Sequence, residues 1–318
     1  MTENNSKPVS IPTALAEVAT AATLAVAPYL RRVARSSPEV DLKVDIHDPV
    51  TVHDQRVEGA IRELLEEITP GSRVLGEEMG EQIDFSLMQN LPEAPLASAV
   101  AISEQVREVV ADLGDRVRWI VDPIDGTANF ASGLTYFATS IGVELDGKMV
   151  AGAVSAPFTY EVFVGDDTEV WHLNEHTGER VPLRSVGPST EAAALIASYY
   201  PGVFSLDLNP DMVRAHEVEL MSTYGTLRRP GAGALDLAMV AAGWIGVSMA
   251  ISFKPWDVAA GIHLVRVAGG HVLNLPVDTD LPDGLRPAVV ASVGNLDAVT
   301  AKRILREVEA ALLRRDNR

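Results

Sequence analysis

One stretch decides the fold: Trp119-Ile120-Val121-Asp122-Pro123-Ile124-Asp125-Gly126-Thr127-Ala128-Asn129-Phe130. Its apolar start predicts the end of a buried strand. Asp122 and Asp125 follow in a turn that Pro123 restricts, and a new segment opens at Gly126. Carboxylates beside free backbone N–H groups suit a divalent cation bound against a phosphate. An ordinary surface turn has a similar composition, so this stretch alone leaves both interpretations open.

The composition limits the class of protein. With 318 residues, the chain is long enough for one large domain or two closely packed ones. Lys and Arg total 26 against 44 Asp and Glu, a net charge of -18, which argues against a nucleic-acid partner. The absence of cysteine excludes disulfides and thiolate chemistry. Residues 1–7 show no secretory signal pattern, and glycines and serines interrupt the longest uncharged run, 237–253, so a cytoplasmic location is expected.

Three further stretches carry acids. Asp48-Pro-Val-Thr51-Val-His-Asp54 precedes a helical pattern, Gly76-Glu77-Glu78 ends a short strand, and Lys254-Pro-Trp256-Asp257-Val-Ala-Ala-Gly261 opens a helix. Each has an ordinary explanation when taken alone, because acids are common at helix N-termini and strand exits. We place Asp54 at a helix N-cap. We expect His53 to be exposed, since no second histidine stands at metal-ligand spacing.

Together and in this order, the four stretches resemble the inositol monophosphatase family of magnesium-dependent, lithium-sensitive phosphatases. The similarity runs from about Leu15 to the last predicted helix. It implies an α/β fold class, a layered αβαβα sandwich of the inositol monophosphatase and fructose-1,6-bisphosphatase type. In that fold, residues 10–190 form an α+β metal-binding half, and residues 191–318 form an α/β half that completes the active site.

The resemblance also implies a phosphomonoesterase with two Mg²⁺ ions, a third and weaker ion near Glu77, and inhibition by Li⁺. The first ion takes Glu77, Asp122 and the Ile124 carbonyl. The second takes Asp122 as a bridging ligand, together with Asp125 and Asp257.

Catalytic roles follow from the same resemblance for Asp54, Thr127 and Glu77. Thr127, paired with Asp54, helps a metal-activated water to attack phosphorus in line. Substrate contacts are implied for backbone N–H groups at Gly126, Thr127, Gly231, Ala232 and Gly233.

Hydrophobic periodicity predicts the elements around these residues. An antiparallel sheet is expected in the first half and alternating strands and helices in the second. The predicted helices are 13–35, 55–67, 103–113, 212–222, 231–243, 258–268 and 296–313. The predicted strands are 74–78, 119–121, 135–144, 150–156, 162–165, 170–172, 179–183, 193–198, 247–253 and 271–275.

Residues 79–117 make a longer connection than shorter family members have at this place. Pro92 and Pro95 indicate a loop before the predicted helix 103–113. A loop of this length suits a lid, a dimer contact or a plain surface excursion. Lys43 lies near where family members often carry a basic residue, and no role is assigned to it.

The substrate is less well defined than the reaction. Inositol-cleaving relatives carry acids in the strand before Trp256-Asp257, where this chain has Gly246 and Ala250. A polyol hydroxyl therefore loses an acceptor worth about 1 kcal/mol. myo-Inositol 1-phosphate is the default substrate. Histidinol phosphate, fructose 1,6-bisphosphate, 3′-phosphoadenosine 5′-phosphate and a non-catalytic metal- or anion-binding role remain open.

Glycosidase chemistry needs two isolated acids and does not fit a clustered set. The expected partner is a small phosphate ester, with no nucleic acid or membrane. A homodimer is expected from family habit.

Overall fold

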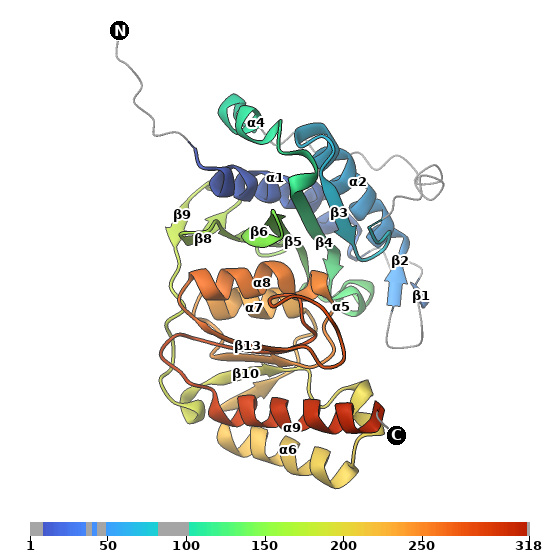
Figure 1. The fold of residues 1–318 in the computed structure, drawn as a ribbon, viewed down its shortest axis with the longest axis vertical. Coiled ribbons are helices and arrows are strands. Elements are labelled where there is room, and N and C mark those ends of the chain that lie inside the picture. The colour runs from blue at the N-terminus through green and yellow to red at the C-terminus, as the bar shows by residue number, and fades with distance from the viewer. Residues whose placement is uncertain (1–8, 36–39, 43–48, 82–101, 317–318) are drawn as a thin grey trace.

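The computed structural model describes residues 9–35, 40–42, 49–81 and 102–316. Its elements stack in five layers, helix, sheet, helix, sheet, helix (Figure 1). The predicted αβαβα sandwich is therefore confirmed. The chain leaves the first large sheet after Pro182 and enters the second at Leu195. The division into two halves at residue 190 stays a prediction.

The first large sheet has seven strands in the order β3-β4-β5-β6-β7-β8-β9. Neighbouring strands are antiparallel except β3 and β4, which are parallel. The central strands are buried because helices cover both faces of the sheet (Figure 1). The strands are β3 (Arg73–Gly76), β4 (Val117–Asp125), β5 (Ala138–Leu145), β6 (Lys148–Ala156), β7 (Glu161–Gly165), β8 (Val170–Asn174) and β9 (Arg180–Pro182).

The second large sheet has five strands in the order β11-β10-β12-β14-β13. β10 is parallel to both β11 and β12, whereas β14 is antiparallel to both β12 and β13. Neither β11 nor β14 was predicted from the sequence. The strands are β10 (Leu195–Ser198), β11 (Thr226–Arg228), β12 (Val247–Ala250), β13 (His271–Leu275) and β14 (Ala288–Ser292).

The outer face of the seven-stranded sheet is covered by α1 (Ile11–Val33) and α2 (Val52–Ile68), with α4 (Glu104–Val110) packed on α1. α1 is long and apolar enough to cross a membrane, with a mean hydropathy of 1.4, but 67% of that window is buried inside the fold. It is accordingly placed as a core helix. α4 begins after its N-cap Ser103, as predicted. Lys43, Pro92 and Pro95 lie outside the described residues.

The middle layer consists of α7 (Gly233–Ala241) and α8 (Pro255–Val267), which lie between the two sheets (Figure 1). α8 approaches the seven-stranded sheet closely because the facing residues are small. A Cβ added at Gly142 would come within 2.7 Å of the Ala259 Cβ, and one added at Gly152 would come within 3.0 Å of the Ala260 Cα. On the other side, a Cβ at Gly261 would come within 2.4 Å of the Leu237 Cβ on α7. The small residues Ala259, Ala260 and Gly261 therefore allow α8 to pack closely against the seven-stranded sheet and against α7.

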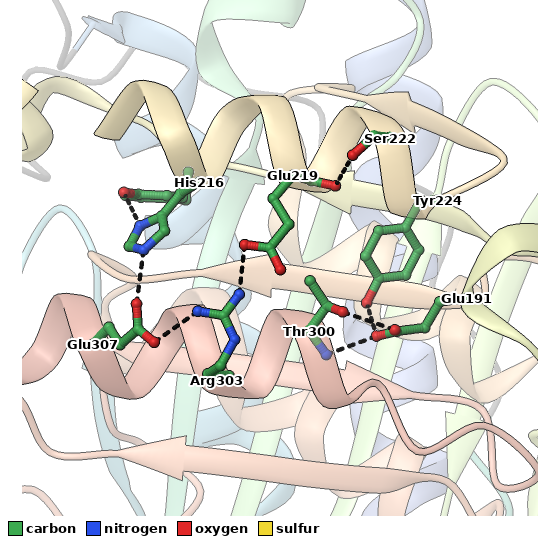
Figure 2. Close-up of polar contacts among 9 residues, drawn as sticks. Glu191, His216, Glu219, Ser222, Tyr224, Thr300, Arg303 and Glu307 are labelled. Carbon is green, nitrogen blue, oxygen red and sulfur yellow. Dashed lines mark hydrogen bonds and ion pairs between the residues drawn. The ribbon is translucent and has the colours of Figure 1, made fainter. Parts of the chain in front are cut away.

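The last layer consists of α6 (Pro210–Thr223) and α9 (Val299–Asp316), which polar side chains hold together (Figure 2). Arg303 of α9 pairs with Glu219 of α6 at 2.5 Å, and Glu307 lies 2.9 Å from the His216 ring nitrogen. Tyr224 and Thr300 both donate to Glu191. Figure 1 places this layer at the end of the molecule opposite α2.

Shorter elements complete the described chain. β1 (Val40–Leu42) pairs antiparallel with β2 (Pro49–Thr51), and neither strand was predicted. α5 (Thr127–Ala131) follows β4 directly. Three 3₁₀ turns are η1 (Gly114–Arg116), η2 (Glu191–Ala193) and η3 (Val203–Asp207).

Candidate active site

Carboxylates from the seven-stranded sheet and from the start of α8 meet at one place. Oxygen atoms of Asp122, Asp125 and Asp257 all lie within 4.8 Å of one another. Asp122 and Asp125 are 2% and 7% exposed. Glu77, which follows β3, hydrogen-bonds through its side chain with Asp122, and its charge raises the pKa of Asp257. The four predicted acids thus lie together, although long segments of chain separate Glu77 and Asp257 from Asp122 and Asp125.

A bulge at the end of β4 turns Asp122 and Asp125 to the same side. Asp122 pairs with Ser140 and Asp125 pairs with Ala138, so two residues of β4 stand opposite one residue of β5. Residues three apart in a regular strand point to opposite faces, and the extra residue reverses this. The Ile124 N–H donates to Asp122 at 3.0 Å, and the Thr139 hydroxyl donates to the Pro123 carbonyl at 2.9 Å. These bonds fix the bulge.

Asp257 is positioned by the start of α8. Pro255 occupies the first turn, and the Asp257 carboxylate accepts the Lys254 N–H at 2.7 Å. Asp257 is therefore the helix N-terminal acid that the local sequence indicated, and it also faces Asp122 and Asp125. The close packing of α8 against β5 and β6 brings it there.

Asp125 accepts hydrogen bonds from the first turn of α7. The N–H groups of Gly233, Ala234 and Leu235 donate to its carboxylate at 3.0, 2.9 and 3.3 Å. The positive end of the helix dipole favours the ionised carboxylate at this place. The Gly233 N–H, predicted to contact substrate, has a protein acceptor in this structure.

Burial and mutual repulsion dominate the electrostatics of these acids. Burial, followed by the charges of Glu77, Asp125 and Asp257, raises the pKa of Asp122 well above its ordinary value. Burial, followed by the Asp257 charge, likewise raises the pKa of Asp125 well above its ordinary value. For Asp257, burial is the main cause that raises the pKa to about 7. A positive charge at the centre of the group would relieve both the burial cost and the repulsion.

Asp54 and Thr127 lie within hydrogen-bond distance across the site. The Thr127 hydroxyl is 3.2 Å from Asp54 and 3.0 Å from the Ile124 carbonyl, and its single proton is shared between these acceptors. The second Asp54 oxygen accepts the Thr51 N–H at 2.8 Å. Thr51, not Asp54, is the N-cap of α2, because its hydroxyl accepts the His53 N–H. Asp54 is the third helical residue and completes a capping box.

His53 is buried, contrary to the expectation from sequence. Its ring nitrogen Nδ1 lies 2.6 Å from the Tyr29 hydroxyl, and its ring packs edge-on against Phe130. Burial, with a contribution from Arg56, lowers its pKa. The spacing of His53 to other histidines does not predict whether its side chain is buried. A residue that helps to bury it, Tyr29, comes from α1.

The predicted substrate contacts gather where α5 and α7 begin. Gly126 has φ = 93°, and a Cβ there would come within 2.8 Å of the Gly231 carbonyl. The position therefore requires glycine, since an added side chain is strained and has no room. Asn129 joins the same two segments by donating to Tyr136 and Pro230 carbonyls at 2.7 and 2.8 Å. Ala232 is the N-cap of α7.

The two substituted acid positions on β12 are not equivalent. A Cβ at Gly246 would come within 2.8 Å of the Ala194 Cβ, at the end of β12 remote in sequence from Asp257. An acidic side chain there would meet core atoms, so the expectation that Gly246 removes a substrate contact is wrong. Ala250 ends β12 and is 1% exposed. It remains the candidate for a lost acceptor.

A group of polar residues beside α7 was not predicted from the sequence. Asp236, fully buried, accepts hydrogen bonds from the hydroxyls of Tyr136 and Tyr199. Burial raises its pKa to about 7, against the effect of these bonds. The Gly231 N–H donates to the Tyr199 hydroxyl at 3.1 Å, so this group holds the turn before α7. An acid inside the apolar helix 231–243 was the signal that could have identified it.

The donor set fits hard divalent cations. Crowded carboxylates and a backbone carbonyl are oxygen ligands of the kind that Mg²⁺ and Ca²⁺ prefer, and no thiolate is present in the chain. The raised pKa values of Asp122 and Asp125 also indicate a cation site, because a bound cation would reverse the local field and favour the ionised carboxylates.

Known proteins are similar to this chain over most of its length. The model of the inositol monophosphatase family matches residues 12–312. The inositol-1-monophosphatase SuhB of Mycobacterium tuberculosis is 34% identical over 226 residues, which cover 71% of this chain and 68% of the relative. The fructose-1,6-bisphosphatase/inositol-1-monophosphatase of Aquifex aeolicus is 28% identical over 223 residues, 70% of this chain and 71% of its own length.

Among solved structures, the extragenic suppressor protein SuhB of Bartonella henselae superposes with a TM-score of 0.69 at 27% identity. The match covers 94% of this chain and 98% of the other. A family match that spans nearly the whole chain, together with the same fold, establishes membership. The chain belongs to the inositol monophosphatase family.

Proposed function

We propose that this metal-dependent phosphatase uses Mg²⁺ to hydrolyse a small phosphomonoester, with myo-inositol 1-phosphate as the first candidate. The observation that carries the proposal is the group of Asp122 and Asp125, both buried, with the half-buried Asp257, joined by Glu77. Buried acids that raise one another's pKa are costly for folding unless they serve a ligand or a reaction.

Glu77, Asp122 and the Ile124 carbonyl would hold one cation, and Asp122, Asp125 and Asp257 a second. Two such ions, when bound, neutralise phosphate charge and supply an activated water at neutral pH. The β4 bulge and the first turns of α7 and α8 hold Asp122, Asp125 and Asp257 through bonds of the protein itself, which supports this assignment. A third ion near Glu77 and inhibition by Li⁺ remain part of the proposal.

Thr127 and Asp54 would orient the attacking water. Asp54 accepts from the Thr51 N–H and hydroxyl, which holds its other oxygen toward Thr127. The Thr127 hydroxyl, which donates to Asp54, then presents a lone pair to a water proton. This is the geometry of a positioned acceptor for proton transfer.

The phosphate would lie against the start of α5, where Gly126 and Thr127 supply N–H groups without helical partners. The Gly231–Gly233 turn would border the alcohol. Its Gly231 and Gly233 N–H groups already bond Tyr199 and Asp125, so we assign this turn a role in shaping the pocket.

A second substrate class has its own support. Ala250 offers no acceptor to a polyol, and the rings of Tyr199 and Phe253 lie 5.2 Å apart beside the Gly231–Gly233 turn. Aromatic side chains pack more favourably against planar ring groups than against hydroxyl-rich ones. Histidinol phosphate and 3′-phosphoadenosine 5′-phosphate are therefore the leading alternatives, ahead of fructose 1,6-bisphosphate.

The test is hydrolysis of inositol 1-phosphate and these alternatives, assayed side by side with Mg²⁺ and with EDTA. We expect phosphate release that requires Mg²⁺ and differs among the esters. No metal-dependent release from any ester would refute the enzymatic proposal and favour a non-catalytic metal- or anion-binding role. A cytoplasmic homodimer is proposed for the native state, and sedimentation of the intact protein tests the dimer.

A further inference from the structure

A buried ion pair holds the turn that carries Glu77. Glu58 of α2 is 0% exposed and Arg62, one helical turn later, is 4% exposed. The Arg62 guanidinium donates to the Glu58 carboxylate at 2.9 Å. Burying two charges requires specific partners, so the remaining contacts of this pair are informative.

The Glu58 carboxylate fills the inside of a tight turn. Gly76 and Gly80 exchange two backbone hydrogen bonds of 3.1 Å, which leaves Glu77, Glu78 and Met79 at the tip. The Glu78 and Met79 N–H groups both donate to Glu58, at 2.7 and 3.2 Å. Two N–H groups that converge on one carboxylate fix the backbone directly after Glu77.

Gly76 makes room for this carboxylate. A Cβ at Gly76 would lie 2.1 Å from a Glu58 oxygen, so any other residue would displace the acid from the turn. The Gly76-Glu77 pair of the sequence is thus explained jointly: the glycine admits Glu58, and Glu58 orients the residue that follows.

Arg62 holds the turn from the other side. Besides pairing with Glu58, its guanidinium donates to the Val74 carbonyl at 3.3 Å and to the Gly80 carbonyl. The Glu77 N–H donates to the Val121 carbonyl of β4 at 3.2 Å. The turn is therefore attached both to α2 and to the strand that ends in Asp122 and Asp125.

α2 connects this turn with the other side of the site. Glu58 lies four residues after Asp54 on the same buried face, and Asp54 accepts from Thr127. One helix thus positions the metal-ligand turn through Glu58 and the Thr127 hydroxyl through Asp54.

We infer that Glu58 and Arg62 are positioning residues that hold the Glu77 carboxylate in place for the cation and thereby set the metal affinity of the site. This inference rests on the proposed function, because it assigns Glu77 to a cation. A purely structural ion pair would affect stability alone. A positioning pair also affects metal binding, since partners that orient ligands typically change affinity by about 10- to 100-fold.

The experiment compares Glu58→Gln with Glu175→Gln. Glu175 accepts from Arg31 with both of its oxygens, and Arg31 also donates to a backbone carbonyl, but that pair is partly exposed and joins α1 to the loop after β8. Mn²⁺ binding to each substrate-free protein is measured from the electron paramagnetic resonance signal of free Mn²⁺. Thermal unfolding in EDTA shows that both variants fold.

We expect Glu58→Gln to weaken Mn²⁺ binding by about 10-fold or more and Glu175→Gln to bind as the unaltered protein does. The Mg²⁺ concentration for half-maximal turnover should rise by a similar factor, while the rate at saturating Mg²⁺ falls by less than about threefold. Arg62→Lys keeps the charge but loses the fork of donors, so it should give an intermediate loss and decides the matter if Glu58→Gln does not fold.

Mn²⁺ affinity of folded Glu58→Gln, or of Arg62→Lys where the first variant is unfolded, within about twofold of the unaltered protein would overturn the inference. In that outcome the unaltered protein still binds Mn²⁺, so the proposed function survives. Absence of Mn²⁺ binding by the unaltered protein would instead contradict the proposed function itself.

Discussion

The two large sheets contribute to the site in different ways. The seven-stranded sheet delivers Glu77, Asp122 and Asp125 at the ends of β3 and β4, where a bulge and a tight turn orient them. The five-stranded sheet delivers no acid from a strand end. Its half contributes Asp257 and the first turns of α7 and α8, which lie between the sheets.

This difference separates two tasks. Strand ends hold carboxylates close together against their own repulsion, whereas helix N-termini supply N–H groups that stabilise negative charge. Asp125 joins the two, because it leaves β4 and accepts three N–H groups of α7. We therefore expect damage to the first half to remove the chemistry and damage to the second half to reduce it.

The largest effect should come from Asp122→Asn. Asp122 is the predicted bridge between both ions, and the amide oxygen can still accept the Ile124 N–H, so the bulge should survive. Loss of several kcal/mol of transition-state stabilisation corresponds to about 1,000-fold or more in turnover. Phosphate release at saturating Mg²⁺ measures it. Activity within tenfold of the unaltered protein would contradict the bridging role.

Asp257→Asn should cost less, about 100-fold, because Glu77, Asp122 and Asp125 remain for a cation. The amide oxygen can keep the Lys254 N–H bond, so α8 should start at the same residue. The same assay, together with Mn²⁺ binding, checks the ranking. A loss of turnover as large as that of Asp122→Asn would show that the two halves contribute equally. That result would contradict the expected difference between them.

Thr127→Val tests the water-orienting pair without touching a carboxylate. Loss of the hydroxyl that donates to Asp54 should lower turnover by about 100-fold and leave Mn²⁺ affinity unchanged. Thr127→Ser keeps the hydroxyl and serves as the matched control. Equal activity of the Val and Ser variants would exclude a role for the hydroxyl.

The stability of the metal-free protein should depend on pH in a defined direction. Asp257 and Asp236 have an ordinary pKa of 3.8 and a folded pKa of about 7, so the folded state binds more protons between these values. The contribution of these two groups to stability is then fully present below about pH 4 and is lost as the pH rises through 7. Thermal unfolding in EDTA at about pH 5 and pH 8 measures the decline.

Mg²⁺ should raise the melting temperature more at the higher pH, because bound cations need the ionised acids. An equal increase at both values would contradict a cation bound to these carboxylates.

The smallest effect concerns the second half alone. Tyr199→Phe removes the hydroxyl that donates to Asp236 and accepts from Gly231, and the loss of these two hydrogen bonds should change KM by about fivefold. Tyr224→Phe removes a comparable hydroxyl bond to Glu191 in the outer layer and is the control (Figure 2). Equal KM values for the unaltered protein and both variants would show that Tyr199 does not shape the substrate pocket.

The family resemblance carried by four short stretches predicted the layers and the meeting of the four acids, and apolar periodicity predicted most of the individual helices and strands. Neither predicted β14, whose residues Ala288–Ser292 are buried on both faces and show no alternation. The burial of His53 depends on Tyr29 from α1, and the exclusion of an acid at Gly246 depends on Ala194. Such contacts between distant segments leave no local signal.

The role of Glu58 could be predicted from the sequence only in part. A charged residue between Val57 and Ile61 on the apolar face of α2 is visible in the sequence. Its partners, the Glu78 and Met79 N–H groups, are not, because a turn of another segment supplies them.

The central claim is that acids from both halves hold paired cations at Asp122. Crystals soaked in Mn²⁺ and recorded at the manganese absorption edge test it most directly. We predict two anomalous peaks about 4 Å apart, one between Glu77 and Asp122 and one among Asp122, Asp125 and Asp257. A map with no peak at these carboxylates, or with peaks only elsewhere on the surface, would contradict the account.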